Sequence, residues 1–357
     1  MPTTYAIPNG ATVFAATTYT GTGAAQSITN GGNNTLGVTF QPDFIWLKSR
    51  SGAYDNNTYD SVRGISAGGS STLITNSTAA ETTYSGFGVS AINSNGFSVI
   101  GNGGLSNLNT GSYVAWQWKA GGTTSSNTSG SITSTVSVNT TAGFSIVTYT
   151  GTGANATVGH GLGVAPKMVI VKNRSAGSTN WCVYHSSLTS AAYSLFLDNT
   201  NAQGSFPTVW NSTAPTSTVF SLGTNLSSNG STNAMVAYCW AAVAGYSAFG
   251  SYTGNGSSDG PFIYCGFRPR FVMIKATSSV GYGYWMIHDT SRGTYNMVNQ
   301  NLYANYSYAE DTDAAGNMDI LSNGFKLRGT VDNANGNGST YIYVAFAENP
   351  FKYANAR

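Results

Sequence analysis

The sequence predicts an all-β protein built from three tandem β-sandwich domains of a jelly-roll or lectin-like type. Two observations support this prediction. One short segment of fixed pattern occurs three times, and short apolar runs alternate with turns rich in Gly, Asn and Ser. No stretch longer than two turns shows helical apolar spacing without a Gly or Pro. An immunoglobulin-type sandwich is the alternative, but the Cys, Trp and Cys arrangement of that fold is missing.

The repeated segment consists of a Pro, one polar residue, four apolar residues and a Lys. Its copies span residues 42–48, 166–172 and 269–275. Four consecutive apolar residues suit a strand that is buried on both faces. A Pro is accepted at the head of a strand because no ladder donor is needed there. We expect the closing lysines to carry the strand ends out to water; they are Lys48, Lys172 and Lys275.

Other matches accompany each copy in the same order. A Tyr-Thr-Gly-x-Gly motif begins 17 residues before Pro166 and Pro269, and 23 residues before Pro42. We expect the six extra residues of the first copy to lie in the turn at residues 31–34. A closing apolar strand reaches its Ala 73, 71 and 76 residues after the three prolines. Anchors at nearly constant spacing indicate repeats of domain length rather than a solenoid.

These spacings place domain boundaries along the chain. We predict domains at residues 1–120, 143–245 and 246–357. The segment 121–142 between the first two begins with a Gly/Ser/Thr-rich run that is typical of a flexible linker. Its later part, 131–142, alternates apolar and polar residues and predicts an extra strand. No comparable linker separates the second and third copies, so we expect these two domains to pack closely.

Composition excludes several functional classes. Charged residues make up 8% of the chain and the formal net charge is +2, so there is no basic footprint for nucleic acid and no polybasic membrane patch. The first residues lack a signal-peptide pattern, and the longest near-apolar run is too short to span a bilayer. We expect a soluble protein made in the cytoplasm. The cysteines are expected to be buried apolar residues without a redox or metal role: Cys182, Cys239 and Cys265.

No catalytic set emerges from the titratable residues. The chain has three histidines, His160, His185 and His288. His185 lies beside Ser186, but nucleophilic catalysis would need a third partner that the sequence does not identify. With 13 Asp and Glu residues in total, a carboxylate pair for glycan cleavage stays open as an alternative. We expect no catalytic residue, no cofactor and no metal.

A charged pair recurs in two of the three copies. Asp60 and Arg63 in the first copy match Asp289 and Arg292 in the third at the same offset, whereas the second copy has the run 185–188 instead. In a chain so poor in charge we interpret the recurrence as an ion pair that braces a turn, ahead of ligand contact.

Two further motifs are weak. Residues 151–156 match the G-x-G-x-x-G/A pattern, but a turn-rich run follows where a dinucleotide site needs a helix, so we predict a turn. Asp311 and Asp313 lack the further oxygen ligands that a Ca²⁺ site usually has. We interpret them as a polar loop tip.

Trp210 is the one binding candidate. It lies between Pro207 and Pro215 and has no counterpart in the other copies. The two prolines predict an exposed loop, and an exposed Trp can contact a sugar or a partner protein. More generally, we expect binding where the copies differ, at residues 51–58, 201–216 and 301–316.

The motifs at residues 149–153, 269–275, 285–289 and 341–351 resemble those of a family of tandem-repeat, virion-associated proteins of tailed bacteriophages, especially marine and cyanobacterial phages. The closing motif at 341–351 is the most specific. The resemblance covers nearly the whole chain. It implies a structural or fibre-like virion component and no catalytic residue. The first copy departs most from the pattern, which suggests that it is the anchoring end.

From these observations we expect a non-enzymatic bacteriophage virion protein on the particle surface, as a tail or head fibre or a capsid decoration. Its expected role is host-surface or glycan attachment, with other virion proteins as partners. The alternatives are a phage-borne glycan depolymerase and a secreted bacterial lectin or adhesin. We expect a homo-oligomer, for which a trimer is one arrangement. The sequence leaves open whether the repeats lie in a line or around a pseudo-threefold axis.

Overall fold

The computed structural model describes residues 6–31, 37–312 and 316–347. The prediction of an all-β protein is confirmed. The helices whose bounds are described are three short pieces, η1 (Gly10–Thr12), α1 (Pro207–Trp210) and α2 (Leu226–Asn229). Among the described residues, no helix is long and apolar enough to cross a membrane.

Strands account for the rest of the regular structure. Those of the first repeat are β1 (Phe14–Thr20), β2 (Gln26–Thr29), β3 (Phe44–Ser49), β4 (Asn57–Asp60), β5 (Ser71–Ile74), β6 (Thr82–Thr83), β7 (Gly88–Asn93), β8 (Gly96–Ile100) and β9 (Ser112–Trp118). Those of the second are β10 (Ser125–Asn127), β11 (Ser134–Asn139), β12 (Phe144–Thr150), β13 (Ala156–Gly159), β14 (Met168–Asn173), β15 (Cys182–His185), β16 (Tyr193–Phe196), β17 (Gly204–Ser205), β18 (Val219–Leu222) and β19 (Ala234–Trp240). Those of the third are β20 (Ser247–Thr253), β21 (Phe262–Tyr264), β22 (Pro269–Ala276), β23 (Met286–Asp289), β24 (Leu302–Tyr303), β25 (Met318–Leu321), β26 (Gly324–Leu327) and β27 (Thr340–Ala347).

Each repeat contains one large and one small sheet. The large sheets have the strand orders β1-β9-β3-β4-β5-β6, β10-β11-β12-β19-β14-β15-β16-β17 and β20-β27-β22-β23-β24. The small sheets have the orders β2-β8-β7, β13-β18 and β21-β26-β25. In every repeat the first long strand pairs with the closing strand, which pairs in turn with the strand of the repeated segment. The threefold repetition read from the sequence is therefore also a repetition of topology.

The repeated segment is the middle strand of each large sheet, as expected. All six residues of β3, all six of β14 and all eight of β22 are buried. Side chains alternate across the sheet because successive residues of a strand point to opposite faces. Ile45 and Leu47 join a core cluster with the small sheet of their repeat, whereas Phe44 and Trp46 join the largest cluster of the molecule.

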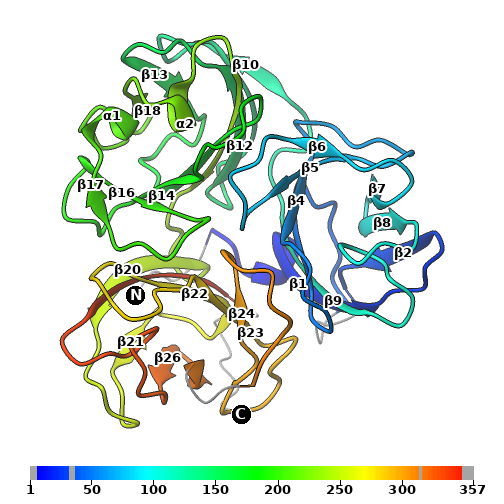
Figure 1. Ribbon diagram of the computed structural model, residues 1–357, viewed down its shortest axis with the longest axis vertical. Coiled ribbons are helices and arrows are strands. Elements are labelled where there is room, and N and C mark those ends of the chain that lie inside the picture. Colours follow the sequence, from blue (N-terminus) through cyan, green and yellow to red (C-terminus); the bar gives the residue numbers. More distant parts are fainter. Residues whose placement is uncertain (1–5, 32–36, 313–315, 348–357) are drawn as a thin grey trace.

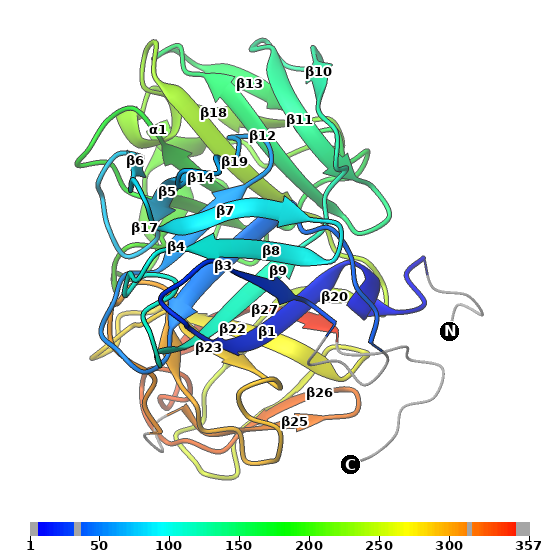
Figure 2. The ribbon, with the colours of Figure 1, turned by 90° about the vertical axis from the view of Figure 1, so that its right-hand side faces the viewer.

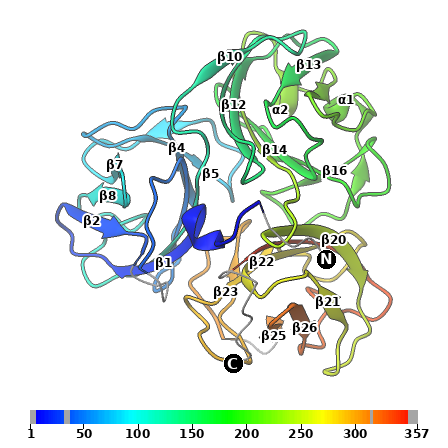
Figure 3. The same cartoon turned by 180° about the vertical axis from the view of Figure 1, so that it is seen from behind.

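That largest cluster is shared by all three repeats. It contains Phe44 from the first repeat, Met168 from the second and Phe271 from the third. The repeats form three lobes around a common centre (Figure 1), and from the side the strands of the first repeat, such as β1, β7 and β8, face the viewer as broad ribbons (Figure 2). From behind, η1 lies over the middle of the ring (Figure 3). The repeats are thus arranged around a pseudo-threefold axis, and the second and third lobes pack on the first as well as on each other.

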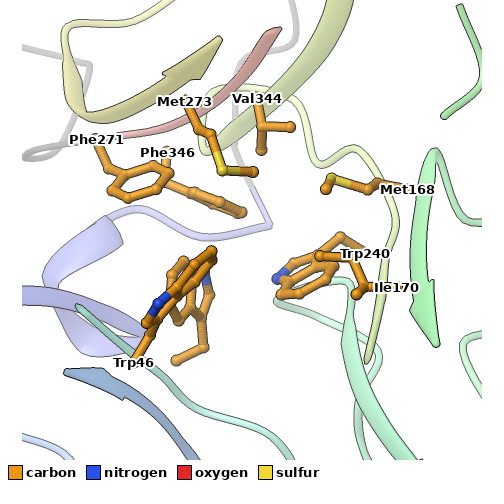
Figure 4. Close-up of a pocket in the computed structure, with 9 residues that line it drawn as sticks. Trp46, Met168, Ile170, Trp240, Phe271, Met273, Val344 and Phe346 are labelled. Carbon is orange, nitrogen blue, oxygen red and sulfur yellow. The ribbon is translucent and has the colours of Figure 1, made fainter. Parts of the chain in front are cut away.

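The interior of the ring is aromatic and tightly filled. Phe44 and Tyr238 have ring centroids 4.3 Å apart, and Trp118 and Trp240 have centroids 6.1 Å apart. A residual cavity of about 10 Å³ lies beside Trp118 and Trp240, and Figure 4 shows the side chains of Trp46, Trp240 and Met273 around it. This volume is at the lower limit for one water molecule. At this level the axis is consequently filled by side chains of the described residues.

The segment predicted as a linker is part of a sheet. β10 and β11 hydrogen-bond to each other, and β11 pairs with β12 of the second repeat. The extra strand predicted within 131–142 is confirmed as β11. The flexible linker is a wrong expectation, since β10 lies within it. Several expectations fall outside the described residues: most of the turn at 31–34, Asp313 and the end of the closing motif after Ala347.

Candidate functional site

The lysines that end the repeated segments are buried, so the prediction that they reach water is wrong. Lys48, Lys172 and Lys275 are each 0% exposed. They follow Trp46, Ile170 and Met273 on the face that points to the axis. The neighbouring repeats cover this face, and the sequence of one repeat gives no sign of that cover.

Each lysine is held by carbonyl oxygens. Lys48 Nζ donates to the carbonyls of Tyr54 and of Ser307, the latter at 2.8 Å and in the third repeat. Lys275 Nζ donates to Thr200 of the second repeat at 2.9 Å and to Gly283 at 2.7 Å. Two of these ammonium groups therefore tie one repeat to the next.

Lys172 is bound within its own repeat. Its Nζ donates to the carbonyl of Thr179 and approaches the hydroxyl of the same residue at 3.3 Å. Burial lowers the pKa of Lys48 and of Lys275 to about 7 and that of Lys172 to about 8. Asp55 and Asp198 oppose the shifts of Lys48 and Lys172 respectively. The three lysines form a polar layer at one end of the aromatic core.

Above this layer a pocket opens on the axis. It is lined by Asn76 of the first repeat, residues 198–200 of the second and residues 305–307 of the third, and its volume is about 360 Å³. This lies within the roughly 300–1,000 Å³ range of small-molecule sites. We call it the axial pocket. Since all three repeats contribute to it, it exists only in the closed ring.

Three equivalent residues, Asn76, Asp198 and Asn305, form its framework. Each side-chain oxygen accepts a backbone N–H from its own repeat: that of Asn56 at 2.8 Å, Trp181 at 2.6 Å and Trp285 at 2.9 Å. The same fixing bond therefore occurs three times, but only the second repeat supplies a carboxylate. Burial raises the pKa of Asp198, against the effects of the Trp181 amide and Lys172.

One donor in the pocket lacks a partner. Asn305 is 5% exposed, and its Nδ2 is buried without a hydrogen-bond partner. A buried N–H group without a partner costs about 1–3 kcal/mol. Asn305 is at the same time one of the residues that line the axial pocket.

Tyrosines extend from the pocket to the surface. Ring centroids are 4.7 Å apart between Tyr306 and Tyr308, 4.8 Å between Tyr306 and Tyr284, and 5.7 Å between Tyr284 and Tyr282. Tyr306 lines the axial pocket. Tyr308 is 49% exposed and Tyr282 is 61% exposed. We call these four residues the tyrosine row.

Two of the three seams between repeats carry matching charge networks. In the first–third seam, Glu310 of the third repeat binds Arg50 of the first at 2.7 Å and Arg292 of its own repeat at 3.0 Å. Trp116 Nε1 of the first repeat donates to Asp289 Oδ2 of the third at 2.9 Å. Arg292 also pairs with Asp289 at 2.6 Å. Burial opposes ionisation of Asp289, but Arg292 outweighs it and lowers the pKa of this carboxyl.

The second–first seam repeats this arrangement. Glu81 of the first repeat binds Arg63 of its own repeat at 2.6 Å and Arg174 of the second at 2.7 Å. Arg63 also pairs with Asp60. The hydroxyl of Tyr238 in the second repeat donates to Asp60 Oδ2 at 2.7 Å. The predicted ion pairs do brace their turns, since Asp60 Oδ1 accepts the N–H groups of Val62 and Arg63. They also join neighbouring repeats.

The third–second seam is uncharged at the same positions. The backbone N–H of Gln203 donates to the backbone carbonyl of Thr277 at 3.1 Å. The backbone N–H groups of Glu310 and Glu81 make the same bond to the carbonyls of Arg50 and Arg174 in the other two seams. His185 takes the position of the two aspartates opposite the start of the middle strand. In the closing strand of the third repeat, Val344 occupies the position that Trp116 and Tyr238 occupy in the closing strands of the first and second repeats. At the positions of these glutamates and aspartates, the third–second seam thus has neutral residues where the other two seams have charged ones.

The sequence-predicted candidates lie outside the axial pocket. Residues 211–214 are exposed and lie outside regular structure, as expected for a loop. Trp210 itself is 1% exposed and its Nε1 approaches Ser194 Oγ at 3.4 Å, so the expected exposure of this side chain is wrong. Pro207 begins the short helix α1 instead of a loop, and this turn folds Trp210 against Tyr184. Trp210 as a ligand contact therefore has no support from its position.

The three histidines are also buried. The exposures of His160, His185 and His288 do not exceed 1%. Burial lowers the pKa of His185 to about 4 and that of His288 to about 3, so both are neutral near pH 7. Asp311 accepts from Asn301 Nδ2 at 2.7 Å. The described residues contain no group of three or more His, Cys, Asp or Glu that could hold a metal ion.

Sequence reasoning missed two recurring sets. Asn107, Asn229 and Asn335 each accept a backbone N–H from the Tyr-Thr-Gly-x-Gly turn, at 3.0, 2.8 and 2.9 Å. Each lies six residues before the first residue of the closing-strand motif, a regularity that alignment of the copies could have revealed. The second set, Asn76, Asp198 and Asn305, lies in segments whose lengths differ between copies. The signal it carries is a Leu three residues earlier in each copy, at Leu73, Leu195 and Leu302.

Comparison with known proteins gives one result. Residues 9–350 match the family described as "Domain of unknown function (DUF7483)", and the chain belongs to this family. A search of curated proteins finds no match to the chain.

Proposed function

We propose that this member of the DUF7483 family is a non-enzymatic structural protein of the bacteriophage particle surface, a fibre component or decoration that contacts the host surface or its glycans. The supporting observation is the closed ring of three repeats with an axial pocket at one end. The pocket is lined by residues of all three repeats, and η1 lies over the middle of the ring in the view from behind (Figure 3). A ring with such polarity suits a protein that attaches by one end and makes contacts with the other.

The architecture also supports the particle setting. We propose that each repeat is a lectin-like or jelly-roll-like sandwich of one large and one small sheet, and that the ring occupies a threefold or single axial position on the particle. One chain supplies the three lobes that a homotrimer would otherwise provide. Oligomerisation of whole rings is then a matter of the outer surface.

Of the alternatives, the glycan depolymerase lacks a supporting observation. Glycoside cleavage usually needs two carboxyl groups about 5–9.5 Å apart. Asp198 is the one carboxylate among the described residues that line the axial pocket. A secreted lectin or adhesin would use the same pocket, so particle association separates it from the proposed function.

The test is to locate the protein on purified particles. Antibodies against the full chain should label washed virions, and quantitative mass spectrometry should find the chain at a fixed ratio to the major capsid protein. Its absence from washed particles would exclude the virion role. Release of reducing ends from host polysaccharide by the purified chain would instead favour the depolymerase.

A further inference from the structure

We infer that the axial pocket and the tyrosine row together form a saccharide-binding site, with one sugar unit in the pocket and the next units on the tyrosines. This inference rests on the proposed attachment role and names its ligand class. The two can fail separately, because binding is measured on isolated protein and display on particles.

The polar groups of the pocket fit hydroxyl groups. Asp198 Oδ1 accepts the Trp181 amide at 2.6 Å, and an ionised carboxylate has about four acceptor positions, so it can also accept from a ligand. Asn305 Nδ2 is a buried donor without a partner. A hydroxyl group both donates and accepts, so neighbouring hydroxyls of one sugar can bind an acceptor and a donor at the same time.

Other ligand classes fit less well. A divalent cation prefers several oxygen ligands with more than one negative charge, whereas the side-chain oxygens of Asn76 and Asn305 already accept backbone N–H groups. A phosphate or carboxylate would meet the charge of Asp198. The ammonium groups of Lys48 and Lys275 beneath the pocket already donate to the carbonyls of Ser307 and Thr200. A neutral, hydroxyl-rich ligand is therefore favoured.

The tyrosine row provides a second type of contact. Aromatic side chains offer a flat apolar surface together with a polar end. Tyr306 lines the pocket and Tyr308 stacks on it with an interplanar angle of 28°. Sugar rings have apolar C–H faces that can cover such a surface. Because the row leads away from the pocket, it suits a chain of sugars better than a single one.

The pocket wall is held rigidly for this purpose. The carbonyls of Thr200 and Ser307 are fixed by buried lysines of the adjacent repeats. Preorganised groups bind a ligand with a smaller loss of conformational entropy. The lysine layer thus positions the site without contacting the sugar.

The test is saturation-transfer NMR on the isolated full-length protein. The probes are glucose, galactose, mannose, N-acetylglucosamine and their β1→4-linked dimers and tetramers, with inorganic phosphate and calcium chloride as competitors. At least one saccharide should show transfer at millimolar concentration, and the tetramer should bind more tightly than the monosaccharide. Neither competitor should displace it.

Substitutions make the test specific. Asp198→Asn should weaken binding by about tenfold, equivalent to roughly 1.4 kcal/mol. It should preserve the fold, since Asn76 and Asn305 make the same backbone bond at equivalent positions. Tyr308→Ala should weaken tetramer binding by about fivefold and leave monosaccharide binding unchanged. Tyr264→Ala, an exposed residue of β21 in a small sheet, is the matched control and should change neither.

Three results would overturn the inference. The first is no saturation transfer from any of these saccharides. The second is saccharide binding that Asp198→Asn leaves unchanged while circular dichroism shows a native fold. The third is Asp198-dependent binding of Ca²⁺ or phosphate in place of sugar, which would assign the pocket to another ligand class.

Discussion

Arg50 and Glu310 lie 260 residues apart in sequence and form a two-point ion pair across the first–third seam, with Nε to Oε2 at 2.9 Å and Nη2 to Oε1 at 2.7 Å. Glu310 also reaches Arg292, whose side chain is fully buried. The pair therefore belongs to a network that connects the first and last thirds of the chain. A planar guanidinium matches a carboxylate at two points, which makes the geometry specific.

A double-mutant cycle should show that this pair is coupled. We expect a coupling free energy of about 1–3 kcal/mol between Arg50→Ala and Glu310→Gln, measured by urea unfolding monitored by circular dichroism. The control pair is Lys326 and Asp259, which lie 2.8 Å apart with Asp259 83% exposed. The control coupling should be clearly smaller, because solvent screens exposed ion pairs. Equal coupling in the two cycles would contradict a structural role of the seam network.

The neutral seam should accept charge only when both partners are introduced. Gln203→Glu alone should lower the free energy of unfolding by about 1 kcal/mol or more, since Thr277 and Leu188 occupy the positions of the two seam arginines. Adding Thr277→Arg should recover about 1 kcal/mol. Thermal unfolding of the two single variants and the double variant measures this. Strictly additive effects would show that the neutral seam does not share the geometry of the others.

Stability should rise with pH between about 7 and 9. Burial holds the pKa of Lys48 and Lys275 at about 7, below the ordinary value of 10.5. In this interval the unfolded chain binds more protons than the folded chain, so raising the pH favours the folded state. The expected gain is on the order of 5 kcal/mol for the two groups together, because each unit of pKa difference corresponds to about 1.4 kcal/mol per group.

Substitution of one lysine should reduce this pH dependence. Lys275→Met keeps the apolar stem and removes the titrating group, so the melting temperature should rise less between pH 7 and 9. Lys326→Met at the surface is the control and should retain the wild-type slope. A slope that Lys275→Met leaves unchanged would assign the pH dependence to other groups.

Trp210 should matter for stability and not for binding. Trp210→Ala should lower the free energy of unfolding by about 3–5 kcal/mol, as expected for truncation of a fully buried aromatic residue. Trp210→Phe should lower it by less, because most of the volume is kept. Saccharide binding by the folded fraction should be unchanged in both variants. Loss of saccharide binding in a stably folded Trp210→Phe protein would indicate that Trp210 contributes to binding.

The fold was predictable where the evidence is local. The middle strand was identified because Pro42, four apolar residues and Lys48 form a self-contained pattern that recurs twice. The ring was not predictable, because its contacts join residues such as Lys48 and Ser307 that belong to different repeats. The sequence of a single repeat shows a Lys at the end of an apolar strand. It gives no indication that carbonyls of a neighbouring repeat surround this Lys. The two prolines around Trp210 misled for a related reason, since Pro207 is equally suited to the first turn of a helix.

The candidate site was less predictable than the fold. The sequence pointed to segments where the copies differ, including 201–216 and 301–316, and part of the pocket does fall in the second of these, at residues 305–307. Asp198 lies just outside the first. An Asp in one copy and Asn in two others is unremarkable in sequence. Its meaning depends on the axis, which only the closed ring defines.

Asn76, Asp198 and Asn305 are equivalent positions with unequal residues. Three identical subunits would have to place the same side chain at all of them, and any ligand on the axis would then face three interchangeable orientations. A single chain is free of that constraint, so one carboxylate can distinguish one direction around the ring from the other two. Because the three lobes belong to one chain, the centre of the ring is not threefold symmetric. An asymmetric molecule can therefore bind there in a single orientation.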